Sequence, residues 1–392
     1  MKSEWNTSAI ANICKVVTDG SHTSPKSVSH GKYMVSVKDF TPYGFDFNGC
    51  RQISFADYEK LKSSGCVPQK GDILIGKDGA RYFEDIIIYN QDEAPALLSS
   101  IAILRCDEEK VIPEYLYYLL KTPSFKKDVK DTYGSGSAIP RIILKDFKRM
   151  KVEYPSIEKQ RQIVSILHDL DAKIFNNQKV NDNLEQQAAA LFSSLYNRSN
   201  TEVRYTDLIQ ILGGGTPKTG ETAYWNGNIA FFTPKDVGTP YTFITEKTIT
   251  EEGLSHCNSR LYPVNTVFVT ARGTVGKVGL SGVPMAMNQS CYALVGKETH
   301  QLLVYFYTLK VVDKLKHKAS GAVFDAITTR DFESEQIMKL SDDDARAFLC
   351  VAEPMFQDIL NNSIENLRLS TLRDFLLPKL MSGEIDVSNI QF

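Results

Sequence analysis

The sequence has no long apolar run and no dominant charge. Among its 392 residues, no apolar stretch approaches the ~18–20 residues that span a bilayer, and the longest, Leu302–Leu309, indicates a buried helix or strand. Residues Met1–Val17 alternate polar and apolar side chains and lack the apolar core of a signal peptide. We therefore expect a cytoplasmic protein with no membrane partner.

Metal-binding and disulfide patterns are absent as well. The seven cysteines form no Cys-x-x-Cys pair, and the six histidines are dispersed, which argues against a zinc site and against a disulfide framework. The net charge of −2 lacks the basic excess that usually marks a nucleic-acid binder. Charge is uneven, however, because Lys121–Lys151 contains nine Lys or Arg against three acids.

Two short motifs resemble catalytic ones without completing them. Residues Gly213–Thr219 are faintly similar to a phosphate-binding loop, but Pro217 stands where that loop needs a glycine and has no N–H to offer. Ser124–Lys127 and Lys218–Gly220 together resemble a penicillin-binding site, yet they lie in different halves of the chain, and Ser124 is explained as a helix N-cap after Pro123. No methyltransferase or nuclease motif is visible. We expect no catalytic residue, metal or cofactor in this chain.

What the sequence does contain is an internal repeat. Four segments of the first half recur in the same order in the second. Their offset falls steadily, from 197 residues between Lys38 and Lys235 to 194 between Gly79 and Gly273, and then to 190 and 185. A steady drift is what small loop deletions in the second copy would produce, so we interpret the halves as two copies of one domain.

Each copy is rich in strands. Short apolar runs such as Ile73–Ile75 and Val267–Val269 enter turns that contain glycine, a pattern typical of buried strands. Ile86–Ile88, Ile101–Leu104 and Tyr292–Val295 are further strand candidates. Pro113–Leu120 and Leu302–Leu315 are predicted helices. Each copy is therefore expected to be a compact α+β domain.

A segment with a different period follows each copy. From Ile163 to Leu195, apolar residues recur at an unbroken 4-3-4-3 spacing, which is the seam of a coiled coil. Adding 185 gives an equivalent seam from Phe348 to Leu380, with one charge at Arg373 and a possible kink at Pro354.

Both seams carry two asparagines at their centre. A buried polar layer fixes register at a cost in stability. If the helices pack antiparallel about the seam midpoints, Asn177 faces Asn366 and Asn181 faces Asn362. We hypothesise that these four residues set an antiparallel register; the alternative is that they are ordinary polar residues on an irregular helix.

The predicted fold is α+β, with two similar strand-rich recognition domains separated by two long helices that form an antiparallel coiled coil. The expected boundaries are a first domain at 1–155, a spacer helix at 156–200, a second domain at 201–341, a second spacer helix at 342–383 and a tail at 384–392.

At this level of detail the whole chain resembles the specificity (S) subunit of type I restriction-modification systems. The resemblance rests on a set of motifs in two-copy order: Gly213–Lys218, Tyr224–Gly227, Val267–Gly279, Asn288–Ser290, Gly134–Phe147, Glu158–Val164 and Leu376–Glu384.

This resemblance implies two target recognition domains, each reading one half of a split double-stranded DNA site. It also implies helices that dock two methyltransferase subunits, which carry S-adenosylmethionine and methylate adenine. Restriction subunits that use ATP and Mg²⁺ would be further partners, and the chain would serve anti-phage defence. Recognition loops diverge in this family, so the bases that are read do not transfer.

DNA binding needs cations and hydrogen-bond donors on loops. The candidate contacts in the first domain are Ser21, His22, Thr23, Lys26, Lys38, Lys77, Arg81, Ser135, Ser137 and Arg141. Those in the second are Thr216, Lys218, Lys235, Arg272, Lys277, Asn288 and Gln289. Each could instead be a surface residue of a polar turn. An alternative function is a non-enzymatic scaffold that uses the same repeat to bind a protein or a glycan; an enzyme ranks third.

Overall fold

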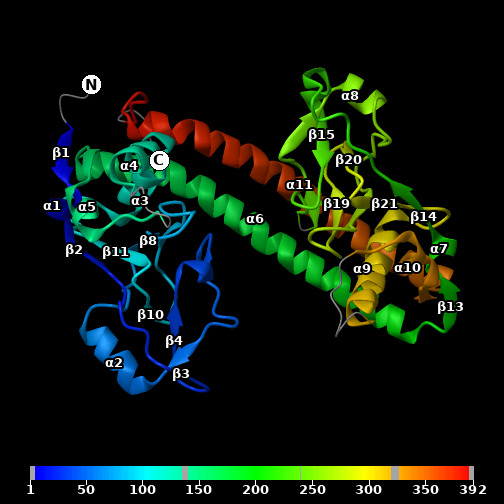
Figure 1. Cartoon of the computed structure of the whole chain (residues 1–392), viewed down its shortest axis with the longest axis horizontal. Helices are drawn as coiled ribbons and strands as arrows, with labels where there is room; N and C mark the ends of the chain where they lie inside the picture. Colours follow the sequence, from blue (N-terminus) through cyan, green and yellow to red (C-terminus); the bar gives the residue numbers. More distant parts are fainter. Residues whose placement is uncertain (1–4, 135–139, 239, 319–325, 388–392) are drawn as a thin grey trace. The chain divides into compact units, whose positions relative to one another are not determined.

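The chain forms two compact units, each containing part of both long helices (Figure 1). The computed structural model describes residues 5–134, 140–238, 240–318 and 326–387. Unit 1 comprises Met1–Lys173 and Arg368–Phe392, and unit 2 comprises Ile174–Leu367. The division falls inside α6 (Ile157–Arg198) and α11 (Asp342–Met381).

The centre of unit 1 is an antiparallel sheet in the order β2-β11-β8-β9. Its strands span Cys14–Asp19, Ile101–Cys106, Ile73–Gly76 and Ile86–Ile88. Successive side chains of a strand point to opposite faces, so Ile73 and Ile75 pack beneath helices while Leu74 packs on the other side. Burial on both faces explains why β8 and β9 are continuous apolar runs rather than alternating ones.

A second sheet in unit 1, in the order β10-β4-β7-β3, supplies the other core. Val35 of β4 packs with Leu74 and Ile103 of the central sheet. The strands are Ala96–Leu97, Lys32–Val35, Gln52–Ile53 and Ser27–Val28; β10 runs parallel to β4, and β7 antiparallel to it. The remaining elements are β1 (Asn6–Ala9) paired with β12 (Lys151–Tyr154), β5 (Phe40–Thr41) paired with β6 (Gly44–Phe45), and helices α1 (Ile10–Ile13), α2 (Phe55–Ser63), α3 (Pro113–Lys121), α4 (Pro123–Tyr133) and α5 (Leu144–Arg149).

Unit 2 has the same topology. Its central sheet runs β14-β21-β18-β19 and adds a fifth strand, β16; its second sheet runs β17-β15-β20, with β20 parallel to β15 and β17 antiparallel. The central sheet consists of β14 (Ile209–Gly213), β21 (Cys291–Gly296), β18 (Val267–Thr270), β19 (Val278–Ser281) and β16 (Tyr241–Thr242). The second sheet consists of β17 (Lys247–Ile249), β15 (Trp225–Phe232) and β20 (Met285–Met287). In addition, β13 (Thr201–Arg204) pairs with β22 (Gln336–Lys339). The helices are α7 (Tyr205–Leu208), α8 (Glu251–Ser255), α9 (Gln301–Lys318) and α10 (Thr329–Ser334). The repeat predicted from the sequence is thus present in the strand order.

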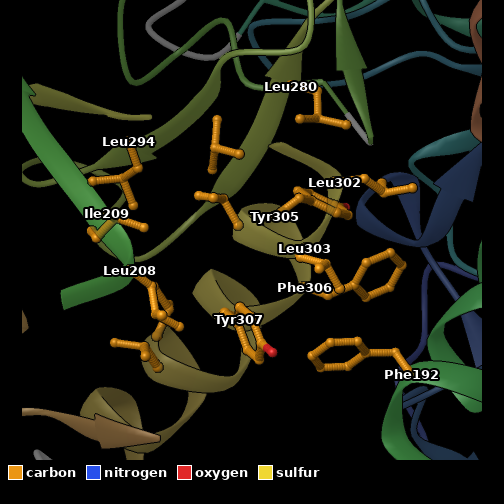
Figure 2. Close-up of a cluster of buried hydrophobic side chains, with 14 of the residues drawn as sticks. Phe192, Leu208, Ile209, Leu280, Leu294, Leu302, Leu303, Tyr305, Phe306 and Tyr307 are labelled. Atoms are coloured by element: carbon orange, nitrogen blue, oxygen red, sulfur yellow. The ribbon is translucent and has the colours of Figure 1, made fainter. Parts of the chain in front are cut away.

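The largest core of unit 2 lies between its central sheet and the helices (Figure 2). Leu294 from the sheet and Leu303 from α9 belong to it, and Phe192 of α6 stacks on Phe306 with ring centroids 5.1 Å apart. The long helix is therefore part of the domain core and not only a connector. No helix in the described part of the chain combines the length and the apolar character that crossing a bilayer requires.

The strand and helix candidates of the sequence are confirmed, with one correction at a helix end. The predicted N-cap Ser124 lies inside α4, and the cap is Thr122, whose hydroxyl accepts a hydrogen bond from the Phe125 N–H at 3.4 Å. Pro123 occupies the first helical position, where its missing N–H costs nothing, so the cap must precede it. The helix α11 continues through Pro354 without interruption.

All twenty seam residues of α6 and α11 are buried or partly buried. In unit 2, Asn177 donates to the Asn366 Oδ1 at 2.9 Å, and Asn362 donates to the Asn181 Oδ1 at 2.9 Å. The paired residue numbers increase along α6 while they decrease along α11, so the two helices are antiparallel in unit 2. In unit 1, the seam charge Arg373 pairs with Asp171 of the facing helix at 2.7 Å.

The C-terminal segment belongs to unit 1. Val387 is fully buried there, and Lys159 pairs with Asp386 at 3.2 Å. The segment expected from the sequence to be a tail, as far as residue 387, is therefore packed against the first domain.

Candidate nucleic-acid interface

In unit 1, three separate segments meet where strand β8 ends. The Lys77 N–H donates to the Ser100 carbonyl at 2.9 Å, and the Ile142 N–H donates to the Lys77 carbonyl at 3.0 Å. Asp78 then forms an antiparallel bridge with Arg141. These bonds hold residue 78 at a fixed point on the edge of the domain.

Unit 2 repeats this junction at the end of β18. The Ala271 N–H donates to the Ser290 carbonyl at 2.8 Å, and the Ile327 N–H donates to the Ala271 carbonyl at 2.9 Å. Arg272 forms the antiparallel bridge, here with Ala326. Asp78 and Arg272 are therefore equivalent positions, as the sequence alignment on Gly79 and Gly273 predicts.

Both loops turn through left-handed backbone. Gly79 and Gly273, which follow the equivalent positions, have φ of +94° and +81°, a region that favours glycine. Each loop closes on a second left-handed residue, Phe83 at φ 61° and Gly276 at φ 75°. The N–H of this residue donates a hydrogen bond to the carbonyl of the last residue of the preceding strand. Phe83 adopts this conformation without being glycine because its ring is fully buried in the core of unit 1.

A capped turn lies beside each loop and carries a lysine. In unit 1 the Asp39 carboxylate accepts from the Ser36 N–H at 2.8 Å, and in unit 2 Asp236 accepts from the Thr233 N–H at 2.8 Å. The same cap presents Lys38 and Lys235 at matching exposed positions. The shared pattern is Ser or Thr, any residue, Lys and Asp, in which the aspartate is structural.

The lysine turn packs on the loop in both units. In unit 1 an open groove of about 450 Å³ is lined by the turn residue Lys38 and the loop residues Asp78 and Arg81. In unit 2 the Thr274 hydroxyl donates to the Pro234 carbonyl at 2.9 Å, which joins the equivalent loop and turn. Each unit thus exposes one composite edge with cations and polar groups.

A third loop begins at the same place in each unit. A Cβ on Gly20 would lie 2.3 Å from the Leu97 carbonyl oxygen, and one on Gly214 would lie 2.3 Å from the Asn288 carbonyl oxygen. Only glycine allows this close approach of two backbones. The loops that carry Ser21–Lys26 and Thr216–Lys218 therefore leave their strands beside the junctions.

Most of the predicted contact residues lie on the surface. The exposed ones are His22, Thr23, Lys26, Lys38, Arg81, Arg141, Thr216, Lys218, Lys235, Arg272, Lys277 and Gln289, and Asn288 is half-buried. Thr216 and Gln289 come from different loops and hydrogen-bond each other. Ser135 and Ser137 lie outside the described residues.

Lys77 and Ser21 were expected from the sequence to be exposed DNA contacts, but both are buried. The Lys77 ammonium, with its side chain 8% exposed, lies 3.4 Å from the Asp19 carboxylate and 3.5 Å from that of Asp78. The Ser21 hydroxyl donates to the Thr23 carbonyl at 2.7 Å and so shapes its own loop. Neither side chain is presented to a ligand in this arrangement.

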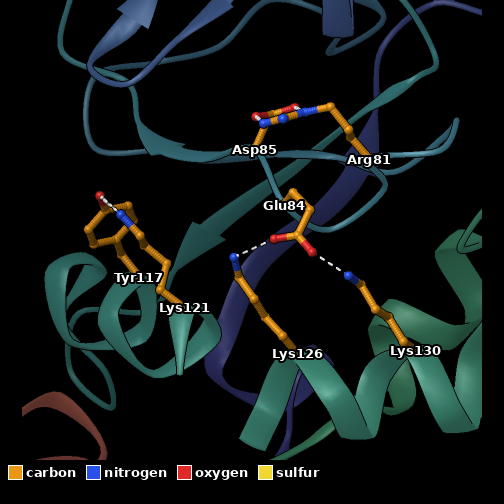
Figure 3. Close-up of polar contacts among 7 residues, drawn as sticks. All are labelled: Arg81, Glu84, Asp85, Tyr117, Lys121, Lys126 and Lys130. Atoms are coloured by element: carbon orange, nitrogen blue, oxygen red, sulfur yellow. Dashed lines mark hydrogen bonds and ion pairs between the residues drawn. The ribbon is translucent and has the colours of Figure 1, made fainter. Parts of the chain in front are cut away.

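Three lysines of the basic run Lys121–Lys151, namely Lys121, Lys126 and Lys130, have partners within the domain (Figure 3). Glu84 accepts hydrogen bonds from Lys126, at 2.8 Å, and from Lys130. Burial raises the pKa of Glu84, but the bonds and charges of these two lysines outweigh it and hold the pKa below its ordinary value. Burial lowers the pKa of Lys121, whose ammonium lies 4.6 Å from the centre of the Tyr117 ring. The contacts of these three cations are thus made within the domain.

Sequence reasoning did not single out Asp78. The available signal was the alignment of the repeats, in which Asp78 matches the selected Arg272 while Lys77 matches the apolar Ala271. Because Ala271 is apolar, the equivalent residue Lys77 is expected to be buried. On this basis the set of candidate contacts would contain Asp78 in place of Lys77.

Comparison with known proteins agrees with this arrangement. The family model described as type I restriction modification DNA specificity domain matches residues 2–186 and 197–339. The MjaIX specificity subunit of Methanocaldococcus jannaschii is 25% identical over 310 residues, covering 72% of this chain and 71% of that protein. The HindI specificity subunit of Haemophilus influenzae is 24% identical over 405 residues, covering 81% and 87%.

A solved structure has the same fold. The S subunit of a type I restriction-modification system from M. genitalium superimposes with a TM-score of 0.59 at 15% identity, covering 97% of each chain. Two matched segments, one in each half, together cover more than half of the chain. The chain therefore belongs to the family of type I restriction modification DNA specificity domains.

Proposed function

We propose that this chain is the DNA-reading subunit of a type I restriction-modification complex and that each unit reads one half of a two-part target. The observation that carries the proposal is the repeated junction. In both units the same hydrogen bonds hold an exposed loop, and the same cap holds an exposed lysine beside it. A duplicated reading edge is what a target with two separate halves requires.

The chemistry of the edge suits DNA. Exposed lysines such as Lys38 and Lys235 can contact phosphates, which position a protein on the duplex, while side chains on the loops can reach base edges, which specify sequence. Because the net charge of the whole chain is only −2, these local cations rather than an overall positive field would supply the attraction.

Under this proposal the chain performs no chemistry itself. Two methyltransferase subunits would dock on its helices and bring S-adenosylmethionine, and restriction subunits would bring ATP and Mg²⁺. The support is the family match, together with the capped and paired state of the acids around the junctions: Asp39 and Asp236 serve as caps, and Asp85 pairs with Arg81 at 2.8 Å.

The test is the adenine methylation pattern of cells that carry this gene and its methyltransferase partner, compared with cells that lack only this gene. We expect a two-part motif to disappear on deletion and to return when the gene is supplied in trans. An unchanged methylation pattern, in cells where the methyltransferase is shown to be active, would overturn the proposal.

Salt dependence separates DNA reading from binding to a protein or a glycan. Binding of the assembled complex to motif DNA should weaken steeply as salt rises, because neutralising phosphates releases counterions. A scaffold for an uncharged glycan would show little dependence on salt.

A further inference from the structure

We propose that residue 272 in unit 2 and residue 78 in unit 1 are matched base-reading positions, with Arg272 reading a guanine and Asp78 a cytosine, each in its own half-site. This inference rests on the proposed function and deepens it. It assigns the chemical identity of one base pair per half-site, which the family match does not supply.

The backbone holds residues 78 and 272 in the same way. The bonds from Lys77 and Ala271 to the Ser100 and Ser290 carbonyls, the following bridges, and the left-handed glycines at 79 and 273 are common to both units. A shared backbone frame brings residues 78 and 272 to the same place relative to any duplex that the domains bind in the same way. The side chains at the two positions differ in the sign of their charge.

The Arg272 side chain is exposed on a loop whose backbone is closed by hydrogen bonds at both ends. Among the residues that the structure describes, no carboxylate pairs with it. A rigidly based guanidinium offers two parallel donors, and the major-groove edge of guanine presents two acceptors, O6 and N7, at the matching spacing.

The Asp78 Oδ1 is buried, has no hydrogen-bond partner and lies 3.5 Å from the Lys77 ammonium, while the side chain as a whole is 30% exposed. The residue lines the groove that Lys38 and Arg81 also line. The Lys77 ammonium thus helps to hold the carboxylate in place. A carboxylate only accepts, so it favours the cytosine amino group, whereas adenine adds an N7 acceptor that would repel it.

The experiment uses the complex of the full chain with its methyltransferase partner. Binding is measured on duplexes that carry the methylation motif, and on duplexes in which one guanine at a time is 7-deazaguanine, which lacks N7. We expect Arg272→Gln to lower affinity for the unmodified motif by roughly 5- to 150-fold. At one guanine, the 7-deaza substitution should weaken binding of the wild-type complex and leave the affinity of the Arg272→Gln variant unchanged.

Lys277→Gln is the matched control, because Lys277 is exposed and lies at the other end of the same loop. It should weaken binding to all duplexes alike and keep the sensitivity to the deaza base. If Arg272→Gln remains as sensitive as wild type at every guanine, or if the second half-site has no G·C pair, the inference is wrong while the proposed function stands. Failure of the wild-type complex to bind its motif overturns both.

Asp78→Asn supplies the second arm, read out by the methylation motif. An amide presents one donor and one acceptor, the pattern that adenine N6 and N7 complement. We expect one position of one half-site to change from cytosine toward adenine, and that half must not be the one that Arg272→Gln affects. A motif unchanged at every position, from a variant that unfolds at the wild-type temperature, would contradict the role of Asp78.

Discussion

Lys77 shows how burial changes the role of a cation at the scale of one residue. Its position on a loop that enters a glycine turn made it a candidate DNA contact. In the folded domain its ammonium lies between Asp19 and Asp78, and the side chains of Lys77 and Asp19 are each 8% exposed. Its direct effect is to neutralise two acids that would otherwise repel each other.

Replacing Lys77 with Met should therefore act on stability. Removing one partner of a buried ion pair leaves an uncompensated charge, which costs about 3–5 kcal/mol. The measurement is the free energy of unfolding in urea. Lys38→Met is the matched control, since Lys38 is exposed and its loss should change stability by no more than about 0.5 kcal/mol. A Lys77→Met protein of wild-type stability would contradict the stabilising role of the buried ion pair.

The sequence placed most of the candidate side chains correctly on the surface, but it did not reveal that Lys77 is buried at the junction. Arg272 was placed correctly on a turn because Gly273 follows it, and a glycine marks a turn by local rules alone. The burial of Lys77 depends on Asp19, which is 58 positions earlier in the chain and belongs to another strand. No local pattern reports such a contact, so only the comparison with Ala271 could have indicated it.

At the scale of elements, the asparagine layer is the feature that the sequence predicted in most detail. Beyond the two direct pairs, Asn177 donates to Glu365 at 2.7 Å, and Asn181 donates to Ser363 at 3.3 Å. A shift of either helix by one turn would bury these amides against apolar seam residues without partners. Unpaired buried amides are costly, so the layer disfavours other registers.

Replacing Asn177, Asn181, Asn362 and Asn366 with Leu should raise the unfolding midpoint and allow the two helices to pair in more than one register. In a unit of this size about 1 kcal/mol shifts the unfolding midpoint by roughly 2–4 °C, so we expect a rise of several degrees. Distances between spin labels on the exposed residues 179 and 358 of unit 2 should change from one narrow distribution to a broad one.

The control for the asparagine layer is the same substitution on the solvent face. Asn183 and Asn361 are exposed on the same two helices, and replacing them with Leu should neither stabilise unit 2 nor broaden the label distances. A narrow distribution in the fourfold Leu variant would show that the apolar seam alone sets the register.

Other elements were less predictable, for physical reasons. The heptad seam extends over many turns, so its period is evident even with Pro354 inside it. The second sheets contain strands of two or three residues, such as Gln52–Ile53 and Met285–Met287, which are too short to show any period. They form because the central sheet needs a cover on its second face, and that requirement is tertiary.

At the scale of the whole chain, unit 1 is built from both ends of the sequence. Its core includes Ile10 near the N-terminus and Leu377, Leu380 and Val387 near the C-terminus. A Cβ on Gly383 would lie 3.1 Å from the Trp5 ring, which shows how closely the two ends pack. The boundary expected at residue 155 therefore separates the first domain from part of its own core.

This closure makes a prediction for domain exchange. One chimera receives residues 1–155 from another member of the family, and a second receives the same residues together with the donor's equivalent of 376–387. Both should change one half of the methylation motif and leave the other half intact, because the reading edge of unit 2 is untouched. The first chimera should be less stable, since the side chains of Leu377 and Leu380 would meet a core that they do not fit.

Mispacked cores cost about 1–3 kcal/mol, which in a unit of this size lowers the unfolding midpoint by roughly 2–12 °C. Calorimetry of the two chimeras, each assembled with the methyltransferase partner, measures the difference. A change in both halves of the motif would show that the units do not read DNA independently. Equal unfolding midpoints for the two chimeras would show that the C-terminal segment does not need to fit the core of unit 1. Its burial would then contribute no specific packing.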